Sequence, residues 1–577
     1  MAWESVIGTA RLLGHAIRVA GARSVEAVET GPFVRWRWPG ALPERLVIAP
    51  QDIRTADPTR AADIYAGIFG FAGKVVETGG RSPFDLEPPS EDWARALHGF
   101  GWLRHLRAAD GALTRSNARA LVADWMQQEA RAPAVAYEPE VTARRLMAFI
   151  TQSPLILEEA DRAFYRRFIK SLVRQVRLLR TGFARTPEGY PRLVAAIAVA
   201  EAAISLDGQS KLVRQATARL DAELGSQILA DGGHVSRNPG VLLELLLDLL
   251  PLRQAYTARG VAPSAAMLGA IDRMMPMLRF FRHRDGEFGR FNGMGTTPAD
   301  LLAAVLAHDD ARGRPVSNAS PSGYQRLDAG RTTLMIDTGA PPPIGVSRDA
   351  HAGCLAFEMS VGEAGAGHRF IVNCGGAEGP APWRQAARQT AAHSTVTIDN
   401  TSSARFAGLA FLTRRFGAAV VAGPRAVTSE RREGAYGTTV SASHDGYLAG
   451  FGLLVSRSLT LAADGASVTG VDQFDIRGRL PAARDRFAVR FHLHPAIRAS
   501  RTGGGEVLLL APDGEAWRFH CGEIEPELEE SVYFSAVHGR RRSLQIVLSG
   551  RARATPQVSW TLVREAVGRG GRFRRPA

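Results

Sequence analysis

The stretch RGRPVSNASPSG, residues 312–323, divides this sequence into two halves with different hydrophobic patterns. Pro, Gly and Ser interrupt it and no apolar period continues across it, as is typical of a linker. Before it, from about residue 56 to 310, apolar residues recur at helical spacing, as at Phe164, Phe168 and Leu172. After it come short runs of Val, Ile, Leu, Phe and Thr separated by Gly and Asp-Gly turns, which indicate strands.

Helices followed by strands, without alternation, favour a helical domain joined to an antiparallel sandwich over a doubly wound sheet. The sequence therefore predicts an α+β multidomain chain. We expect an N-terminal extension at 1–55, a helical domain at 56–315 and an antiparallel β-sandwich at 316–577. The Gly- and Arg-rich end, from about residue 568, is expected to be a disordered basic tail.

The composition is that of a globular protein with an excess of arginine. The chain has 577 residues, of which 45% are hydrophobic and 22% charged, and its formal net charge is +14. Lysine occurs only at Lys74, Lys170 and Lys211, so nearly all the positive charge is Arg. This balance suits an anionic partner. We exclude nucleic acid, because the sequence has no zinc-finger spacing, aromatic RNA-binding motif or basic zipper, and its Arg are scattered among Asp and Glu.

The sequence gives no readable secretory signal and no membrane span. Arg11 and Arg18 interrupt the apolar residues near the N-terminus. The apolar helices expected at 193–204 and 241–252 contain Glu or Asp, which are costly in lipid. Three cysteines are too few for a disulfide framework. We therefore expect no transmembrane segment, and the missing signal favours the cytoplasm.

The segment DGGHVSRNP, residues 231–239, precedes a strongly apolar helix. Its glycines allow a tight turn, so His234 and Asn238 are expected at the mouth of a helix, where they could face a cleft. Asn238 followed by Pro239 is also a good helix N-terminus, which gives Asn238 a structural alternative. We expect His234 to be exposed in the cleft.

Two histidines begin expected strands in the second half, His351 and His393, and they could share a cation if the strands are neighbours. Structural histidines held by hydrogen bonds are the alternative. A rival pair is His492 and His494, whose spacing of two places both on one strand face. His444 precedes an Asp-Gly turn and needs no catalytic role.

Four motifs together resemble one known family. They are DGGHVSRNP at 231–239, AHAGCLAFE at 350–358, VNCG at 372–375 and RQTAAHST at 388–395. This ordered set is similar to the heparinase II/III-like polysaccharide lyases, and the resemblance spans most of the chain. The resemblance implies an incomplete α/α toroid followed by a β-sandwich, and cleavage of acidic polysaccharides by β-elimination.

The resemblance also implies roles for particular residues. His234 matches the toroid residue that contacts the substrate carboxylate, and Asn238 would position the substrate. His351 and His393 match two ligands of a structural zinc, and Asn373 falls where the family has an aspartate ligand. If the zinc site exists, the nitrogens of the two histidines should converge within about 5 Å.

The sequence departs from the family where the catalytic tyrosine is expected, because residues 279–284 read RFFRHR. We expect His283 to be the replacement base, and Arg282 or Arg388 to bind negative charge. A second catalytic histidine of the family is replaced by Asp349.

The resulting hypothesis is a polysaccharide lyase-like protein that cleaves a uronate-containing acidic polysaccharide, with one structural zinc as its only expected cofactor. The C5 proton of a uronic acid becomes removable when its carboxylate is neutralised, after which a base takes it and an acid protonates the leaving oxygen. The alternative is a non-catalytic glycan-binding or cell-envelope biogenesis protein on the same scaffold. A glycoside hydrolase is a third possibility, although no convincing pair of carboxylates is visible. The resemblance favours the cell envelope or periplasm.

Overall fold

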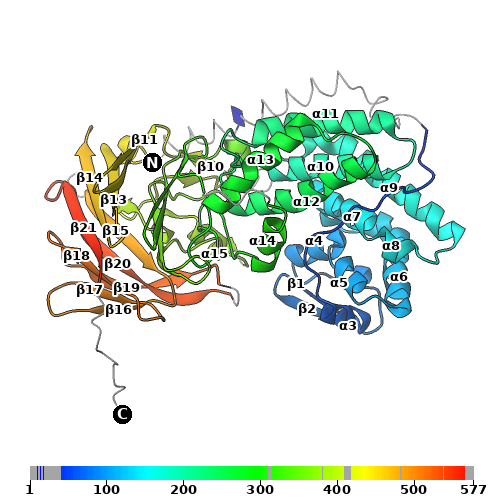
Figure 1. The fold of residues 1–577 in the computed structure, drawn as a ribbon, viewed down its shortest axis with the longest axis horizontal. Helices are drawn as coiled ribbons and strands as arrows, with labels where there is room; N and C mark the ends of the chain where they lie inside the picture. Colours follow the sequence, from blue (N-terminus) through cyan, green and yellow to red (C-terminus); the bar gives the residue numbers. More distant parts are fainter. Residues whose placement is uncertain are drawn as a thin grey trace, which may run out of the picture.

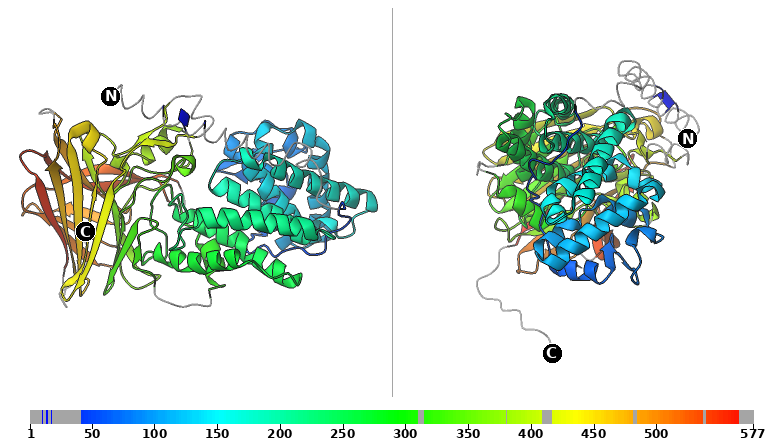
Figure 2. Two further views of the ribbon diagram at one scale, coloured as in Figure 1. Left: turned by 90° about the horizontal axis from the view of Figure 1, so that it is seen from above. Right: turned by 90° about the vertical axis from the view of Figure 1, so that its right-hand side faces the viewer.

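The computed structural model describes residues 10, 13, 14, 17, 41–309, 315–379, 381–408, 417–480, 484–536 and 539–565. Its helices gather at one end of an elongated molecule and its large sheets at the other (Figure 1). The same division is visible from above (Figure 2). The predicted order of a helical domain followed by a sandwich is confirmed. The basic tail predicted from residue 568 lies outside the described residues.

The helical half consists mainly of α-helices between residues 59 and 306. They are α3 (Thr59–Tyr65), α4 (Glu91–Gly99), α5 (Leu103–Ala108), α6 (Ala112–Gln128), α7 (Pro139–Thr151), α8 (Ser153–Leu157), α9 (Arg162–Gly182), α10 (Tyr190–Ser205), α11 (Ser210–Gln227), α12 (Pro239–Ala258), α13 (Ala265–Phe280) and α14 (Ala299–Leu306). Short 3-10 turns lie between them: η1 (Pro83–Asp85), η2 (Glu129–Arg131), η3 (Ala134–Tyr137) and η4 (Phe183–Arg185).

Side-chain caps begin several of these helices, and one of the caps was predicted from the sequence. The Asp161 carboxylate accepts a hydrogen bond from the Phe164 backbone N–H at 2.7 Å at the start of α9. The Asn238 side chain accepts from the Gly240 backbone N–H at 2.8 Å, and Pro239 is the first residue of α12. The predicted capping role of Asn238 is therefore confirmed.

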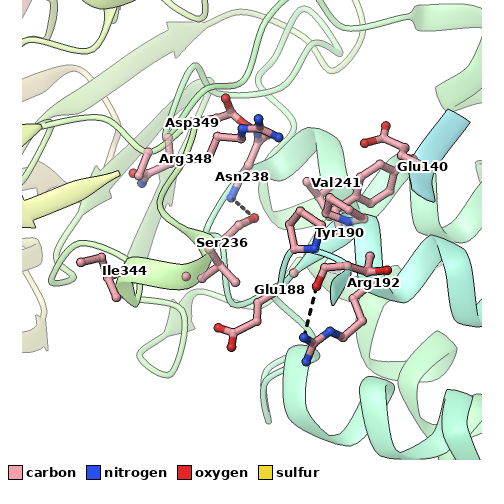
Figure 3. Close-up of a pocket in the computed structure, with 18 residues that line it drawn as sticks. Glu140, Glu188, Tyr190, Arg192, Ser236, Asn238, Val241, Ile344, Arg348 and Asp349 are labelled. Atoms are coloured by element: carbon pink, nitrogen blue, oxygen red, sulfur yellow. Dashed lines mark hydrogen bonds between the residues drawn. The ribbon is translucent and has the colours of Figure 1, made fainter. Parts of the chain in front are cut away.

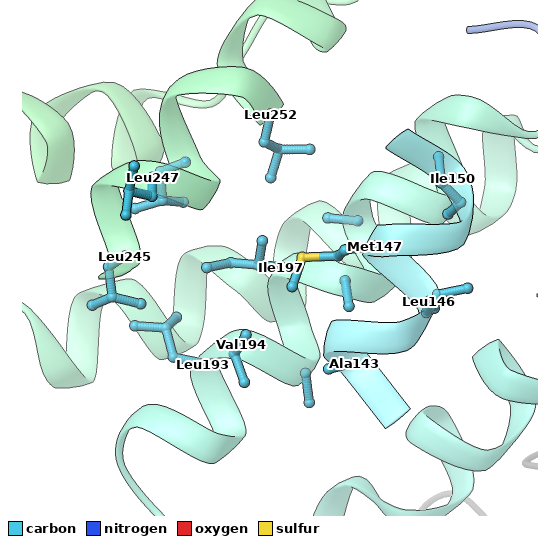
Figure 4. Packing of buried hydrophobic residues seen from close by; sticks show 14 of the residues in the cluster. Ala143, Leu146, Met147, Ile150, Leu193, Val194, Ile197, Leu245, Leu247 and Leu252 are labelled. Carbon is cyan, nitrogen blue, oxygen red and sulfur yellow. The ribbon is translucent and has the colours of Figure 1, made fainter. Parts of the chain in front are cut away.

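The helices form the incomplete α/α toroid that the sequence predicts. α4 packs on α7, α7 on α10, α10 on α12 and α12 on α14, while α9, α11 and α13 pack against this row. α10 is buried throughout residues 193–205, and Figure 4 shows Leu193 and Ile197 between residues of α7 and α12. Full burial of such an aliphatic side chain contributes roughly 1.5–3 kcal/mol, so this all-round apolar helix is the centre of the domain.

Two features of this half are absent from the sequence-based prediction. A small hairpin, β1 (Ile68–Phe71) with β2 (Lys74–Glu77), lies between α3 and α4. The segment before α3 also packs on the toroid, since Leu46, Ile48 and Ile53 contact its core. Part of the range predicted as an N-terminal extension is thus attached to the helical domain.

The sandwich consists of two large antiparallel sheets. In the described residues one has the order β11-β12-β13-β14-β21-β18-β17-β16, and the other has the order β19-β20-β15-β7-β6-β5-β4-β3 with β8 paired to β15. The first sheet contains β11 (Val427–Gly434), β12 (Gly437–His444), β13 (Leu453–Ala462), β14 (Ser467–Ile476), β16 (Arg498–Arg501), β17 (Val507–Leu510), β18 (Ala516–Cys521) and β21 (Gln557–Arg564). The second contains β3 (Asn318–Ala319), β4 (Tyr324–Ala329), β5 (Thr332–Asp337), β6 (Phe357–Val361), β7 (His368–Val372), β8 (Val396–Ile398), β15 (Arg486–Leu493), β19 (Glu527–Tyr533) and β20 (Arg541–Arg551).

Smaller elements complete this half of the chain. They are the pair β9 (Arg405–Phe406) and β10 (Val420–Ala422), the helices α15 (Ala381–Ala387) and α17 (Leu448–Phe451), and the 3-10 turns η5 (Ile344–Val346) and η6 (Thr390–Ala392).

The sandwich core lies between the two sheets and draws residues from both. Burial alternates along β13, as expected for a strand with one face on the core. Trp560 of β21 stacks on Phe357 of the opposite sheet, with ring centroids 5.6 Å apart. A side chain at Gly470 on the neighbouring strand would meet the Trp560 ring at 2.0 Å, so glycine is required there.

One buried arginine connects the toroid to the sandwich. Arg237, just before α12, forms an ion pair with Asp337 at the end of β5, and its guanidinium stacks over the Tyr324 ring at 4.6 Å. It also donates to main-chain carbonyls at residues 322–323 and 339–340, at 2.8–3.2 Å. These bonds hold the start of α12 against the sandwich and so fix the walls of the cleft between them.

Candidate functional site

A cavity of about 240 Å³, lined by polar and apolar side chains, lies where the toroid meets the sandwich (Figure 3). The toroid contributes the start of α7, the segment 186–192 and the start of α12, and the sandwich contributes residues 344–350. We call this cavity the cleft. Its charged and hydrogen-bonding side chains are Glu140, Thr186, Glu188, Tyr190, Arg192, Ser236, Asn238, Asn292, Arg348 and Asp349.

Tyr190 and Glu140 stand at one side of the cleft, at the N-termini of α10 and α7. The Arg144 guanidinium, one turn after Glu140, donates a hydrogen bond to the Tyr190 hydroxyl. Burial nevertheless raises the pKa of Tyr190, so the phenol keeps its proton. Burial also raises the pKa of Glu140, whose carboxyl group has no hydrogen bond or ion pair within the described residues. The cleft therefore contains a protonated phenol and a carboxyl group, and the Arg144 and Arg348 guanidinium groups partly oppose the rise in the pKa of that carboxyl.

Asn238 lines the cleft, and its side-chain oxygen is occupied by the cap of α12. Arg348 is exposed on the opposite, sandwich wall, next to Asp349. The lining has more carboxyl groups than guanidinium groups. The carboxyl groups belong to Glu140, Glu188 and Asp349, and the guanidinium groups to Arg192 and Arg348. The arginine excess of the chain is thus not concentrated here.

His234 does not face the cleft, and the prediction of an exposed histidine is wrong. It is only 1% exposed and lies beneath Ser236. Its Nε2 bonds to Gln227 Oε1 at 3.0 Å, while Nδ1 bonds to the Ser236 hydroxyl at 2.7 Å and accepts from the Ser236 backbone N–H at 3.1 Å. The bond to the amide oxygen requires the proton on Nε2, so Nδ1 is the acceptor. The sequence of the turn at residues 231–239 does not indicate that Gln227, at the end of α11, would cover the His234 ring.

Burial lowers the pKa of His234 to about 3, so the ring is neutral at physiological pH. A buried neutral ring cannot touch a substrate carboxylate. Its contacts instead fix Ser236, whose hydroxyl also accepts from the Asn238 backbone N–H at 3.4 Å. His234 is therefore a positioning residue under the cleft wall.

His283 is also buried, away from the cleft. Its Nε2 donates to Glu358 Oε2 at 2.9 Å, and its Nδ1 bonds to the Ser360 hydroxyl at 2.8 Å, so it connects the end of α13 to β6. Burial lowers the pKa of His283. The side chain is 0% exposed, so His283 has no access to a substrate. The prediction that His283 is the replacement base is therefore not supported by its position.

The two predicted substrate-binding arginines lie apart from each other. Arg388 is 7% exposed, donates to the carbonyls of Ala350 and Ser347 at 2.8 and 3.1 Å, and stacks on Phe406 at 4.2 Å. It therefore supports the sandwich wall of the cleft from behind and does not contact a ligand there. Arg282 lines a different hollow and donates to the Gly286 carbonyl at 3.3 Å.

His351 and His393 do converge, as predicted. His351 Nδ1 and His393 Nε2 are 2.9 Å apart, and the Asn373 amide oxygen accepts from the Ser394 backbone N–H at 3.0 Å, next to His393. His393 Nδ1 bonds to the Gln389 carbonyl at 2.8 Å, so its Nε2 is the acceptor of the His–His bond. Burial lowers the pKa of His393 to about 4, and that of His351 well below its usual range.

This donor set does not fit a zinc ion. The two imidazoles bond to each other directly, and the Asn373 amide is used on both sides, since its nitrogen donates to Glu358 at 3.0 Å. Within the described ranges no group of three His, Cys, Asp or Glu side chains could hold a metal. The zinc therefore stays a prediction from the resemblance.

The rival histidines have separate partners. His492 is buried and bonds to Ser531 and to the Ala391 carbonyl at 2.8 and 3.0 Å, whereas His494 accepts from Arg369 at 3.4 Å. His444 accepts from the Gly446 backbone N–H at 3.0 Å and closes a turn, in agreement with a structural role.

Sequence reasoning missed Tyr190, Glu140 and Arg348. Tyr190 follows Gly189 and precedes Pro191, and Glu140 follows Pro139. Gly and Pro are common where a helix begins, so in the sequence Tyr190 and Glu140 look like residues of a helix N-terminus with no functional role. Their proximity depends on how α7 and α10 pack, which no local pattern indicates.

The toroid, the two-sheet sandwich and the cleft between them define a protein with a polysaccharide-lyase fold. A family model described as "Heparinase II/III-like, C-terminal" matches residues 311–561. FtsZ-localized protein C of Caulobacter vibrioides (strain NA1000 / CB15N) is 32% identical over 578 residues, covering 96% of this chain and 96% of the relative. The chain belongs to the heparinase II/III-like family.

Solved structures agree with this fold. Heparinase III superposes with a TM-score of 0.67 at 13% identity, covering 94% of this chain and 91% of that chain. A mutant of heparan sulfate lyase HepC from Pedobacter heparinus gives a TM-score of 0.61 at 14% identity, covering 95% and 87%. At these identities the likeness is one of fold. In the described part of the chain, none of the helices combines the length and apolar character needed to cross a bilayer.

Proposed function

We propose that this protein binds a polysaccharide in the cleft between the toroid and the sandwich. The observation that carries the proposal is the lining itself, in which Asn238, Tyr190 and the exposed Arg348 line one cavity of a lyase fold. Such groups recognise sugar hydroxyl and carboxylate groups. The two histidines expected to do chemistry lie buried outside this cavity, which favours glycan binding over the reaction that the resemblance implies.

The test is a binding measurement by calorimetry with a panel of soluble polysaccharides, some uronate-containing and some neutral. Arg348→Ala should weaken binding of the uronate polymers by about tenfold, roughly 1.4 kcal/mol. Arg498→Ala is the matched control, because Arg498 is also exposed but lies on β16, outside the cleft. Failure of every polysaccharide to bind, or equal binding by both variants, contradicts the proposal.

The second candidate is cleavage of a uronate-containing acidic polysaccharide by β-elimination, and the pair of Glu140 and Tyr190 favours it. Glu140 would take the C5 proton, the C–H electrons would form the C4=C5 double bond, and the C4–O bond would break. Tyr190 would protonate the leaving oxygen. The conjugated product absorbs in the ultraviolet. Tyr190→Phe should abolish that absorbance without abolishing binding, and a wild-type protein that binds but forms no chromophore contradicts this candidate.

The relative's name supports a further proposal about where the chain acts. FtsZ-localized protein C is similar along nearly the whole chain, so we propose that this protein also localises with FtsZ and contributes to biogenesis of the cell envelope. A fluorescent fusion should coincide with FtsZ in the cell and disperse when FtsZ is depleted. Unchanged placement after depletion contradicts it.

A further inference from the structure

A second cavity lies where the end of α13 meets the sandwich, apart from the cleft. It has a volume of about 980 Å³ and is lined by the end of α13 and the residues just after it, by β4 and the turn after β4, by the turn between β6 and β7, and by one residue of β11. No residue lines both this cavity and the cleft. We call it the basic hollow.

Arginines dominate the lining of the basic hollow. They are Arg279, Arg282, Arg284, Arg326 and Arg431, and the lining has one carboxylate, Asp328. Two carboxylates reach these arginines from outside the lining, because Asp309 pairs with Arg279, and Glu433 pairs with Arg431 at 2.7 Å. Five guanidinium groups and three carboxylates leave an excess of two positive charges among the described residues. None of the five arginines bonds to a residue of the cleft in that part of the chain.

Two of the arginines hold the walls of the hollow in place. Arg326 pairs with Asp328 through Nε and Nη2 at 2.6 and 3.0 Å. Its Nη1 donates to the carbonyls of Phe280 and Arg282, both at 2.7 Å. Arg284 donates to the Gly330 carbonyl at 3.2 Å. These bonds fasten the end of α13 to β4 and to the turn that follows it.

Arg282 has unused hydrogen-bonding capacity. It is half-buried, it has no ion pair in the described ranges, and its one side-chain hydrogen bond there runs from Nε to the Gly286 carbonyl at 3.3 Å. The nearby Asp285 carboxylate is already paired with Arg369 at 2.7 Å. Burial and repulsion from Arg326 lower the pKa of Arg282, but a guanidinium group stays charged at neutral pH. Nη1 and Nη2 of Arg282 are therefore available to a ligand.

Arg431 offers a second donor from a different element. It lies on β11 of the other sheet, its Nε pairs with Glu433, and its Nη1 donates to the carbonyls of Arg326 and Ser317 at 2.8 and 3.4 Å. Its Nη2 has no hydrogen bond to any residue that the structure describes. A ligand in the hollow would thus meet guanidinium groups from the helical half and from the sandwich.

We propose that the basic hollow binds a phosphomonoester group carried by a small molecule, with Arg282 and Arg431 as donors. A phosphomonoester has a charge of about −1.5 to −2 at pH 7, which matches the excess of positive charge, and its oxygens accept the paired N–H groups of a guanidinium. A sulfate ester has a single negative charge and would neutralise the hollow less well. The volume leaves room for the sugar or similar group that carries the phosphate. This site does not depend on the polysaccharide binding proposed for the cleft.

The experiment measures binding to the full chain by calorimetry at constant ionic strength and about pH 7.5, where a phosphomonoester is mostly a dianion. Glucose 6-phosphate should bind about tenfold more tightly than glucose 6-sulfate, because of its extra charge, and glucose should not bind. Arg282→Gln should weaken binding of glucose 6-phosphate by at least about tenfold, since it removes a charged donor.

Arg273→Gln is the matched control. Arg273 is also half-buried, lies on α13 outside the hollow, and donates to one carbonyl, that of Leu229, at 3.4 Å. Like Arg282 it has no ion pair among the described residues. Its replacement should therefore leave binding of glucose 6-phosphate unchanged.

Further variants keep the result interpretable. Arg431→Gln should also weaken binding, which covers the case in which Arg282→Gln fails to fold, and Arg282→Lys should bind more weakly than wild type because it lacks the planar fork. Arg348→Ala, in the cleft, should change polysaccharide binding and not this site, so the two proposals fail separately. Vesicles that contain phosphatidic acid present the same group on a lipid surface.

Three results overturn the proposal. The first is absence of glucose 6-phosphate binding, including the case in which the vesicles bind and the sugar phosphate does not. The second is equal binding of the phosphate and sulfate esters. The third is unchanged binding in every folded variant of Arg282 and Arg431.

Discussion

The Arg237→Met variant tests the argument that one buried arginine joins the two domains. The change removes the ion pair with Asp337 and the donors to the carbonyls at residues 322–323 and 339–340. Met keeps much of the apolar volume, so the main cost is an orphaned buried carboxylate. Breaking one side of a buried pair costs about 3–5 kcal/mol, and we expect a loss of this size in the free energy of unfolding.

The loss should depend on pH. Burial already raises the pKa of Asp337, and Arg237 opposes that rise. Without Arg237 the pKa in the folded state rises further above the unfolded value, so the variant binds a proton on folding. Stability from such a group is present at low pH and is lost as pH increases through the folded pKa. The deficit of Arg237→Met should therefore be smaller at about pH 5 than at about pH 8.

The assay is urea unfolding followed by circular dichroism and by tryptophan fluorescence at the two pH values. The double variant Arg237→Met with Asp337→Asn removes the orphaned charge, so it should recover about 1–3 kcal/mol at the higher pH and lose the pH dependence. A deficit that is the same at both pH values, or a double variant no more stable than the single one, would refute the reasoning.

Three other outcomes are expected. His234→Ala should cost about 2–4 kcal/mol, because it leaves a cavity and unpaired polar groups, and an unchanged melting temperature would return His234 to an exposed role. His393→Ala should not change the zinc content, which by elemental analysis should be well below one per chain; stoichiometric zinc in the wild type, lost in the variant, would restore the metal site. Glu140→Gln should stabilise the protein by about 0.5 kcal/mol at about pH 8 and by less at about pH 5, since the folded-state pKa of Glu140 is raised; a larger effect at the lower pH would contradict the raised pKa.

Local patterns predicted the elements of the fold well, for physical reasons visible in single segments. The helical period at Phe164, Phe168 and Leu172 predicted α9, and Asn238 with Pro239 predicted the start of α12. The hairpin at residues 68–77 was missed, because its two strands have only four residues each and show no alternation of buried and exposed positions.

The candidate site was predicted less well, because exposure is a property of packing. The glycine-flanked turn at 231–233 suggested an open position for His234, whereas Gln227 and Ser236 enclose it. His351 and His393 were correctly paired through the resemblance. Only the structure shows that the two imidazoles bond to each other. Only the structure shows that the Asn373 amide is hydrogen-bonded to Ser394 and Glu358.

The sequence by itself determined the two-domain architecture and the family, since period, linker and ordered motifs are carried by neighbouring residues. Only the tertiary structure decided which polar groups reach solvent. Packing of α7 on α10 brought Glu140 and Tyr190 into the cleft. The reason is that the burial and the charge environment of a side chain depend on residues far away in the sequence. Arg54 and Asp248, for example, form an ion pair although about two hundred residues separate them, and no local sequence pattern indicates such a contact.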